Sequence, residues 1–337
     1  AVVLSSHEGA LHPKLAIDAP IPNDIPADHV RVRVHAASLN PVDGKYDNWK
    51  GLMEREAGGS SQPFVLGLDG AGVIDALGSS VDSERWQIGS RVAFHLWLGR
   101  GDGSFAEYCV AHEGTLVRIP DNVTDETAAA TPCAMWTAYK AVVTKLRAPP
   151  GASSIVVTSG SGGVGCFAVQ LAKLLGINTI IATCSSTSSE RVRELGATHC
   201  IDYHTENDIA AAIRRIVPSG VPYAVDSVSS DSATNLIASL AIDGELAAVA
   251  GSPCRDASIT FLTGYSFHDV CLGFAAYQSG NVKRLLGDIG EACMKLLASG
   301  SIDPCIGRRV TLEELPEMIA KARDGISGGK VVVTIAP

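Results

Sequence analysis

Three glycines at a fixed spacing are the strongest chemical signal in this chain of 337 residues. They form a G-x-G-x-x-G pattern directly after the apolar, β-branched run 154–158. In this pattern the first glycine permits a tight turn, the second lets backbone N–H groups approach a pyrophosphate, and the third lets a helix pack closely on the strand. The segment therefore predicts a dinucleotide site that includes Ser159, Gly160, Gly162, Gly163, Val164 and Gly165.

The helix that such a site requires is also visible. Apolar residues recur at helical spacing after the glycines, and Gly176 stands where a helix commonly ends. The first turn of this helix would place partial positive charge beside the phosphates.

A second set of residues concerns the ribose of the nucleotide. NAD-specific folds place an acidic residue about 20 positions after the glycine motif, where it holds the ribose 2′-OH. Here the stretch 182–191 has no carboxylate before Glu190 and offers hydroxyl groups instead. We expect a 2′-phosphate there, and hence NADPH. The hydroxyls of Ser185 and Ser186 are expected to bind it, with Arg191 or Tyr203 nearby. The same serines also suit the N-cap of a helix that starts near Glu190, and both roles are compatible.

The elements that position these residues fall into two kinds. Residues 28–40 alternate between apolar and polar, which is typical of an antiparallel strand with one solvated face. Up to about residue 120 the chain is rich in turns, which favours a small barrel or sandwich. After residue 150 strands and helices alternate, as in a doubly wound sheet. We expect its six strands at 154–158, 178–183, 199–203, 223–228, 245–250 and 269–275, and we expect a final strand at 329–335 to return to the first domain.

Composition narrows the function classes. The formal charge of −9 and the pI near 5.5 argue against a nucleic-acid partner. No apolar stretch approaches the roughly 20 residues that span a bilayer, and the first residues do not resemble a signal peptide, so we expect a cytoplasmic protein without membrane attachment. The nine cysteines are scattered without a C-x-x-C pair, which argues against a disulfide framework or a zinc knuckle.

Four segments together resemble the medium-chain dehydrogenase/reductase superfamily. They are 37–43 (A-S-L-N-P-V-D), 63–73 (P-F-V-L-G-L-D-G-A-G-V), 103–108 (G-S-F-A-E-Y) and the glycine loop, and the closing Gly-Lys-Val-Val fits as well. The resemblance implies an α/β protein with a GroES-like β-barrel catalytic domain, at 1–134 plus 279–337. It also implies a doubly wound, six-stranded Rossmann domain at 135–278 that binds NADP, and a homodimer.

The zinc ligands of the superfamily's alcohol dehydrogenases are not matched. The positions of the first Cys, the His, its neighbouring Glu and the last Cys correspond here to Asn40, Leu68, Asp69 and Cys133. Leucine has no lone pair, a neutral amide binds zinc poorly, and one thiolate does not make a tetrahedral set. We therefore expect no metal, and Cys133 as a small packing residue.

The segment 39–45 (L-N-P-V-D-G-K) is similar to the zinc-free branch of quinone oxidoreductases, 2-alkenal reductases and enoyl reductases. This implies an NADPH-dependent reductase that transfers hydride to quinones or other conjugated carbonyl acceptors. An enoyl or 2-alkenal reductase is the alternative enzyme, and a non-catalytic NADPH-binding redox sensor is a second alternative. In both enzyme alternatives the hydride acceptor is a small molecule.

Three residues near this segment are candidates for catalysis. Asn40 would bind the substrate oxygen or the nicotinamide ribose, unless it only caps an Asn-Pro turn. Lys45 and Tyr46 would donate to the developing oxyanion, unless they are a solvated lysine and an aromatic prop of the loop. Asp43 is expected to pin the loop as an acceptor. By resemblance, Thr137 and Ala250 complete the cofactor site.

Overall fold

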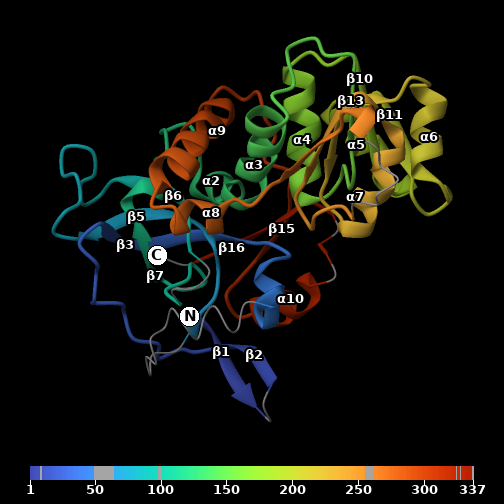
Figure 1. Ribbon diagram of the computed structural model, residues 1–337. Helices are drawn as coiled ribbons and strands as arrows, with labels where there is room; N and C mark the ends of the chain where they lie inside the picture. Colours follow the sequence, from blue (N-terminus) through green and yellow to red (C-terminus); the bar gives the residue numbers. More distant parts are fainter. Residues whose placement is uncertain are drawn as a thin grey trace. The chain divides into compact units, whose positions relative to one another are not determined.

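The computed structural model describes all residues except 8–9, 49–63, 98–100, 255–260, 324, 327 and 336–337. The chain divides into two compact units (Figure 1). The first contains Ala1–Trp136, Leu272–Gly300 and Pro304–Pro337, and the second contains Thr137–Cys271 and Ser301–Asp303. The sequence analysis expects domain boundaries after residues 134 and 278. These boundaries stay a prediction, because a domain is a part that folds on its own.

The first unit is built on a seven-stranded sheet of order β15-β16-β3-β5-β6-β8, in which β7 also pairs with β3. Every neighbouring pair is antiparallel except β15 with β16. The strands are β3 (His29–Leu39), β5 (Asp69–Leu77), β6 (Arg91–His95), β7 (Tyr108–His112), β8 (Val117–Arg118), β15 (Ile306–Val310) and β16 (Lys330–Thr334).

Strand β3 confirms the expected alternation. Val30, Val32 and Val34 are buried in the core of this unit, whereas Arg33 is exposed and Arg31 is half-buried. The final strand also returns as expected, because Val331 in β16 pairs with Leu39 in β3. This pairing brings residues near 330 next to residues near 40, where the candidate catalytic segment begins.

Smaller elements complete the first unit. A three-stranded sheet of order β2-β1-β4 contains β1 (Val2–His7), β2 (Ala10–Leu15) and β4 (Phe64–Val65). The helices are α2 (Asp125–Ala129), α3 (Pro132–Tyr139, which runs into the second unit), α8 (Gly273–Gln278), α9 (Asp288–Ala298) and α10 (Leu315–Ala322). A short 3₁₀ helix, η1 (Asp43–Lys45), follows β3. Among the described residues, no helix is long and apolar enough to cross a bilayer.

The second unit holds a six-stranded parallel sheet of order β11-β10-β9-β12-β13-β14. Its helices flank the strands (Figure 1). This order confirms the doubly wound fold. The elements are β9 (Ser154–Val157), α4 (Gly163–Leu174), β10 (Thr179–Cys184), α5 (Ser189–Leu195), β11 (His199–Asp202), α6 (Ile209–Ile216), β12 (Val221–Asp226), α7 (Ser230–Leu236), β13 (Leu240–Ala248) and β14 (Ser266–Asp269).

The prediction for the sixth strand is wrong in position. It was placed at 269–275, but β14 ends at Asp269 and helix α8 begins at Gly273. The residues between and after them are apolar, and Val270 and Leu272 are buried outside any strand. A short apolar run can form a strand or a buried helix and loop, and periodicity alone does not separate these outcomes.

Candidate active site

The glycine loop has the geometry of a phosphate cradle. A Cβ on Gly165 would lie 2.0 Å from the carbonyl oxygen of Ser159, and one on Gly160 would lie 2.8 Å from the Cβ of Ala182. Both glycines are therefore needed for the close packing of α4 against the strands. No side chain caps α4 at its N-cap residue, Gly162. The N–H groups of the first turn have no acceptor within the helix, so this terminus fits an anion such as a pyrophosphate.

Thr183, near the end of β10, holds this loop in place. Ser159 has a φ of +51°, which is costly for a residue with a side chain. Its N–H donates to the Thr183 hydroxyl at 3.0 Å, and the N–H of Gly160 donates to the Thr183 carbonyl oxygen at 2.8 Å. Sequence reasoning missed Thr183, because a threonine in a strand carries no distinctive signal.

Asp226 forms hydrogen bonds at the same carboxyl-terminal end of the parallel strands. It is fully buried at the end of β12 and accepts from the hydroxyls of Thr158 (2.8 Å) and Ser232 (2.5 Å). Ala250 is exposed just beyond β13. In parallel α/β sheets, ligands bind at the carboxyl ends of the strands, which is where these residues and the glycine loop lie.

Three of the four residues proposed for the 2′-phosphate come together. Ser185 and Ser186 follow β10, Tyr203 follows β11, and Cys184 pairs with Asp202 across these strands. Tyr203 is 51% exposed. The side chain of Ser185 contacts the Ser188 hydroxyl at 2.6 Å. Neither Ser185 nor Ser188 makes a side-chain cap bond, so the alternative in which these serines cap a helix is wrong in that detail.

An acidic residue does lie beside these serines, but it comes from the next strand. Asp202 accepts from the backbone N–H of His204 and of Ser186, and these hydrogen bonds lower the pKa of its carboxyl group. Arg191, the fourth proposed residue, is paired with Asp303 at 2.5 Å and with Glu194 at 3.1 Å. Thr137 is buried on α3.

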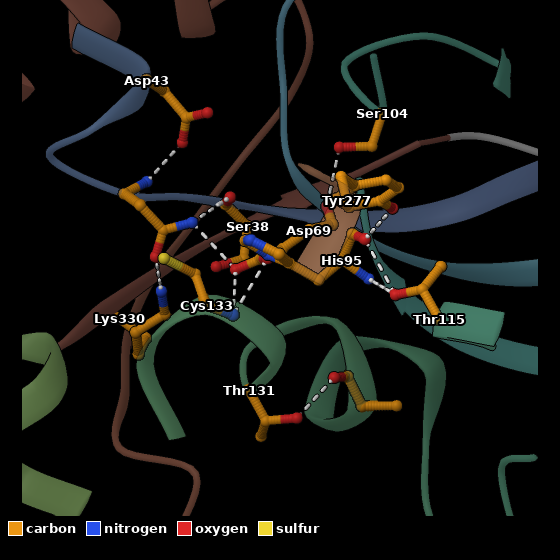
Figure 2. A network of polar contacts seen from close by, with 12 residues as sticks. Ser38, Asp43, Asp69, His95, Ser104, Thr115, Thr131, Cys133, Tyr277 and Lys330 are labelled. Carbon is orange, nitrogen blue, oxygen red and sulfur yellow. Dashed lines mark hydrogen bonds and ion pairs between the residues drawn. The ribbon is translucent and has the colours of Figure 1, made fainter. Parts of the chain in front are cut away.

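The first unit contains a buried polar network centred on Asp69, at the start of β5 (Figure 2). Oδ1 of Asp69 lies 2.8 Å from Nδ1 of His95, and Oδ2 accepts from Nδ2 of Asn40 at 2.8 Å. The backbone N–H of Cys133 donates to both carboxylate oxygens at 3.0 Å. A carboxylate is an acceptor, so His95 carries its proton on Nδ1 in this pair. The network brings Asn40, Asp69 and Cys133 together.

Lys330 completes the network from β16. Its ammonium group is buried and donates to Oδ1 of Asn40 at 2.6 Å. Nδ2 of Asn40 also donates to the Ser38 carbonyl oxygen at 3.2 Å. Both amide ends of the proposed catalytic Asn40 therefore have partners within the protein. The sequence signal for Lys330 was a charged residue at the start of an otherwise apolar strand, and sequence reasoning did not use it.

The network does not offer a good zinc site. Among the described residues, Asp69, His95 and Cys133 each present one possible ligand atom, all within 4.8 Å of one another. Both Asp69 oxygens and one His95 nitrogen are already in hydrogen bonds. Burial, with the nearby Asp69 charge, holds the pKa of the Cys133 thiol well above its usual range, which disfavours the thiolate that zinc needs. Leu68 has no donor atom, so these residues lack a tetrahedral set.

A pocket lies beside the loop that follows β3. Its described lining residues are mostly apolar and include Val42, Leu66, Leu68 and Trp97, with Asp43 and Tyr46 as the polar side chains. Tyr46 is buried, and this burial raises the pKa of its phenol. Lys45 is half-buried and is not among the lining residues. Of the three proposed catalytic residues, Tyr46 thus lines the pocket and Asn40 belongs to the Asp69 network, whereas Lys45 belongs to neither.

Comparisons with known proteins agree with this architecture. The alcohol dehydrogenase GroES-like domain family matches residues 26–121, and the zinc-binding dehydrogenase family matches 163–286. The chain is 30% identical to the chloroplastic quinone-oxidoreductase QR1 of Triphysaria versicolor over 326 residues, which cover 94% of this chain and 92% of the relative.

Two further matches extend the comparison. The chloroplastic NADPH-dependent alkenal/one oxidoreductase of Arabidopsis thaliana is 38% identical over 212 residues, or 61% of this chain and 53% of the relative. The quinone oxidoreductase structure from Pseudomonas syringae pv. Tomato has a TM-score of 0.80 at 26% identity, with 99% of each chain covered. Alignments with several curated relatives span between about half and two thirds of the relative's length. On the glycine cradle, the two-unit fold and the match to QR1 along most of its length, this chain belongs to the medium-chain dehydrogenase/reductase family, in the branch of the quinone oxidoreductases and enoyl reductases.

Proposed function

We propose that this protein is a zinc-independent reductase that uses NADPH to reduce quinones or other conjugated carbonyl compounds. The observation that carries the proposal is the glycine loop at the start of α4, whose geometry fits the pyrophosphate of a dinucleotide. The pocket beside η1 is small, and its described lining is apolar apart from Asp43 and Tyr46. An uncharged, flat, conjugated acceptor suits such walls, and a hydrogen-bond donor suits its carbonyl oxygen. An anionic acceptor would lose its hydration there, because no basic side chain is among the described lining residues.

Each part of the site has a role in this reaction. The glycine loop and the first turn of α4 would hold the pyrophosphate of NADPH, which supplies the hydride when bound. Addition of hydride leaves negative charge on the acceptor oxygen, and a proton from solvent completes the two-electron reduction to a hydroquinone or a saturated carbonyl. Tyr46, with Lys45 as the second donor, would stabilise that charge. The Asp69 network would fix the loop from which these two side chains extend.

Support for NADPH over NADH comes from the end of β10. The hydroxyls of Ser185 and Ser186 and the exposed phenol of Tyr203 can donate to a 2′-phosphate, and Arg191 would join them if its pairing with Asp303 opens. The alkenal/one oxidoreductase relative is itself named as NADPH-dependent. By resemblance we also propose a homodimer, and the cytoplasmic location stays a prediction.

Reduction of an enoyl or 2-alkenal double bond is the alternative activity. This reaction needs the same stabilisation of an oxyanion. The similarity to a relative named as an alkenal/one oxidoreductase supports this alternative. Quinones need less help from a donor, because their reduced form is an aromatic ring. An enone therefore depends more strongly on Tyr46 and Lys45 than a quinone does.

NADPH oxidation tests the proposal, with duroquinone and cyclohexenone as acceptors. Removing one donor from such a site costs about a hundredfold or more in rate. We therefore expect kcat/KM for cyclohexenone to fall about that much in Tyr46→Phe or Lys45→Met, and to fall less for duroquinone. Lys295→Met, at an exposed lysine on α9, is the matched control. NADPH binding without turnover on any acceptor would favour the redox-sensor alternative. Tightly held zinc, with loss of activity on chelation, would contradict zinc independence.

A further inference from the structure

Two free cysteines lie together at the edge of the parallel sheet. Cys184 is the last residue of β10, and Cys200 lies in β11, the edge strand. The register pairs Ala182 with Cys200, and residues two apart on a strand share a face, so both thiols lie on the same face of the sheet. A hydrogen bond joins the two thiols. The reaction proposed above uses neither of them.

The two thiols differ in their access to solvent. Cys184 is only 1% exposed, and burial, together with the neighbouring thiol, raises its pKa to about 12. Cys200 is half-buried, and its S–H donates to the carbonyl oxygen of Ser189, at the start of α5, at 3.6 Å. Oxidation of cysteine is selective for accessible sulfur atoms. An oxidant in solution therefore reaches Cys200 first, and Cys184 lies behind it as a second thiol.

The thiol pair is connected to the proposed site for the 2′-phosphate. The segment that begins with Ser185 follows Cys184 directly in the chain. The N–H of Ser186 in this segment donates to Oδ2 of Asp202 in β11 at 3.0 Å. Among the described strands β11 pairs only with β10, so it can shift without breaking a second ladder of hydrogen bonds. Such a shift would move Asp202 relative to the two serines.

We propose that Cys184 and Cys200 are an oxidation site, at which a hydroperoxide converts the two thiols into a disulfide that weakens binding of the NADPH 2′-phosphate. In the first step the sulfur of Cys200 gives two electrons to the hydroperoxide. Its O–O bond breaks, and a sulfenic acid and one water or alcohol are formed. In the second step the sulfur of Cys184 attacks the sulfenic acid. The S–S bond forms, and the hydroxyl group leaves as water with the proton of Cys184. The inference rests on the proposed function for the identity of the cofactor.

The geometry of the strands connects the disulfide to the cofactor site. A disulfide holds the two Cβ atoms about 3.5–4.5 Å apart. Diagonal neighbours on adjacent strands are about 7–8 Å apart. Closing the bond between Cys184 and Cys200 therefore requires β11 to move toward the end of β10. The movement changes the contact between Asp202 and Ser186, and with it the position of the hydroxyls proposed to bind the 2′-phosphate.

The test treats the full chain with hydrogen peroxide in the absence of cofactor. We expect peptide mass spectrometry without reductant to find Cys184 linked to Cys200. We expect the affinity for NADPH to fall by at least about tenfold in calorimetric titration, as loss of one charge-assisted hydrogen bond to the phosphate would give, and the affinity for NADH to fall less. Dithiothreitol should restore NADPH binding. Bound NADPH should slow the formation of the linked peptide.

Three variants make the test specific. Cys200→Ser and Cys184→Ala should bind NADPH equally well before and after peroxide. Cys254→Ser is the matched control, because Cys254 is an exposed cysteine in the same unit, and this variant should respond to peroxide like the wild type. Absence of the linked peptide in peroxide-treated wild type overturns the proposal. Unchanged NADPH affinity in the linked protein, or a peroxide effect that persists in Cys200→Ser, also overturns it. A linked peptide in a protein that binds neither cofactor before oxidation would support the thiol pair and would contradict the proposed function instead.

Discussion

Nζ of Lys330 donates a 2.6 Å hydrogen bond to Oδ1 of Asn40, across 290 positions of the chain. The bond exists because β16 pairs antiparallel with β3, with Val331 opposite Leu39. It places a buried ammonium next to the Asp69 network.

Replacing Lys330 with Met should destabilise the first unit by about 1–3 kcal/mol, because it leaves the buried Oδ1 of Asn40 without its donor. All four tryptophans of the sequence lie within Ala1–Trp136, so tryptophan fluorescence during urea unfolding reports on this unit. The exposed Lys295→Met should change the unfolding free energy by less than about 0.5 kcal/mol. Equal effects of the two substitutions would mean that the buried ammonium has no special role.

Asp69→Asn should cost about 2–3 kcal/mol in the same experiment. The new amide keeps the shape of the side chain but presents N–H to a neighbouring donor, either the His95 ring or the Asn40 amide. The control is Asp47→Asn, which removes only an exposed ion pair with Arg323 and should cost at most about 1 kcal/mol. A cost for Asp69→Asn as small as that of the control would show that the network tolerates an unpaired donor.

The stability of the first unit should depend on pH through Asp43. The pKa of this carboxyl group is about 8 in the folded protein and near 3.8 in the unfolded chain. Between these values the folded protein holds the extra proton, so raising the pH favours unfolding, by at most about 1.4 kcal/mol per pH unit. The stabilisation is complete below pH ~3.8 and lost as the pH rises through about 8. Urea unfolding of wild type and Asp43→Asn over this range should give free energies whose difference changes with pH. If the unfolding free energies of the two proteins changed with pH in parallel, the raised pKa of Asp43 would be contradicted.

Ser185→Asp should weaken NADPH binding by at least about tenfold and change NADH binding by less than about threefold. The introduced carboxylate repels the 2′-phosphate but can accept from a 2′-OH. The control is Ser153→Asp, which makes an equal charge change just before β9, at the amino-terminal end of the parallel strands and thus at the end opposite to Ser185. Calorimetric titration of both cofactors measures the effect. An equal loss for NADPH and NADH would mean that residue 185 does not contact the 2′ position.

The fold could be predicted from the sequence because its signals are local and repeated. The glycine loop, the alternation of β3 and the strand–helix rhythm after residue 150 each follow from spacing along the chain. The error at 269–275 arose where spacing gives no answer, because an apolar run beside Gly273 suits either a strand end or a helix. Tertiary contacts decide such cases.

The candidate site was only partly predictable. Asn40, Asp69 and Cys133 could be identified because the family resemblance matches their positions to the zinc-site residues of the superfamily's alcohol dehydrogenases. Their partners His95 and Lys330 are far from them in sequence and join them only through the pairing of β5 with β6 and of β3 with β16. The sequence also could not predict that only one carboxyl oxygen of Asp43 has a hydrogen-bond donor, since this depends on the tertiary surroundings of a buried side chain.

The pairing of β16 with β3 also bears on the order in which the chain acquires structure during synthesis. The parallel sheet of the second unit is complete once residues up to 269 have left the ribosome, and each of its neighbouring strands lies within that stretch. The sheet of the first unit is still incomplete at that point, because β16 (residues 330–334), which pairs with one side of β3, has not yet been synthesised. We therefore expect the nucleotide-binding fold to form first on the nascent chain, while β3 and the carboxylates near it stay uncapped until the last strand emerges.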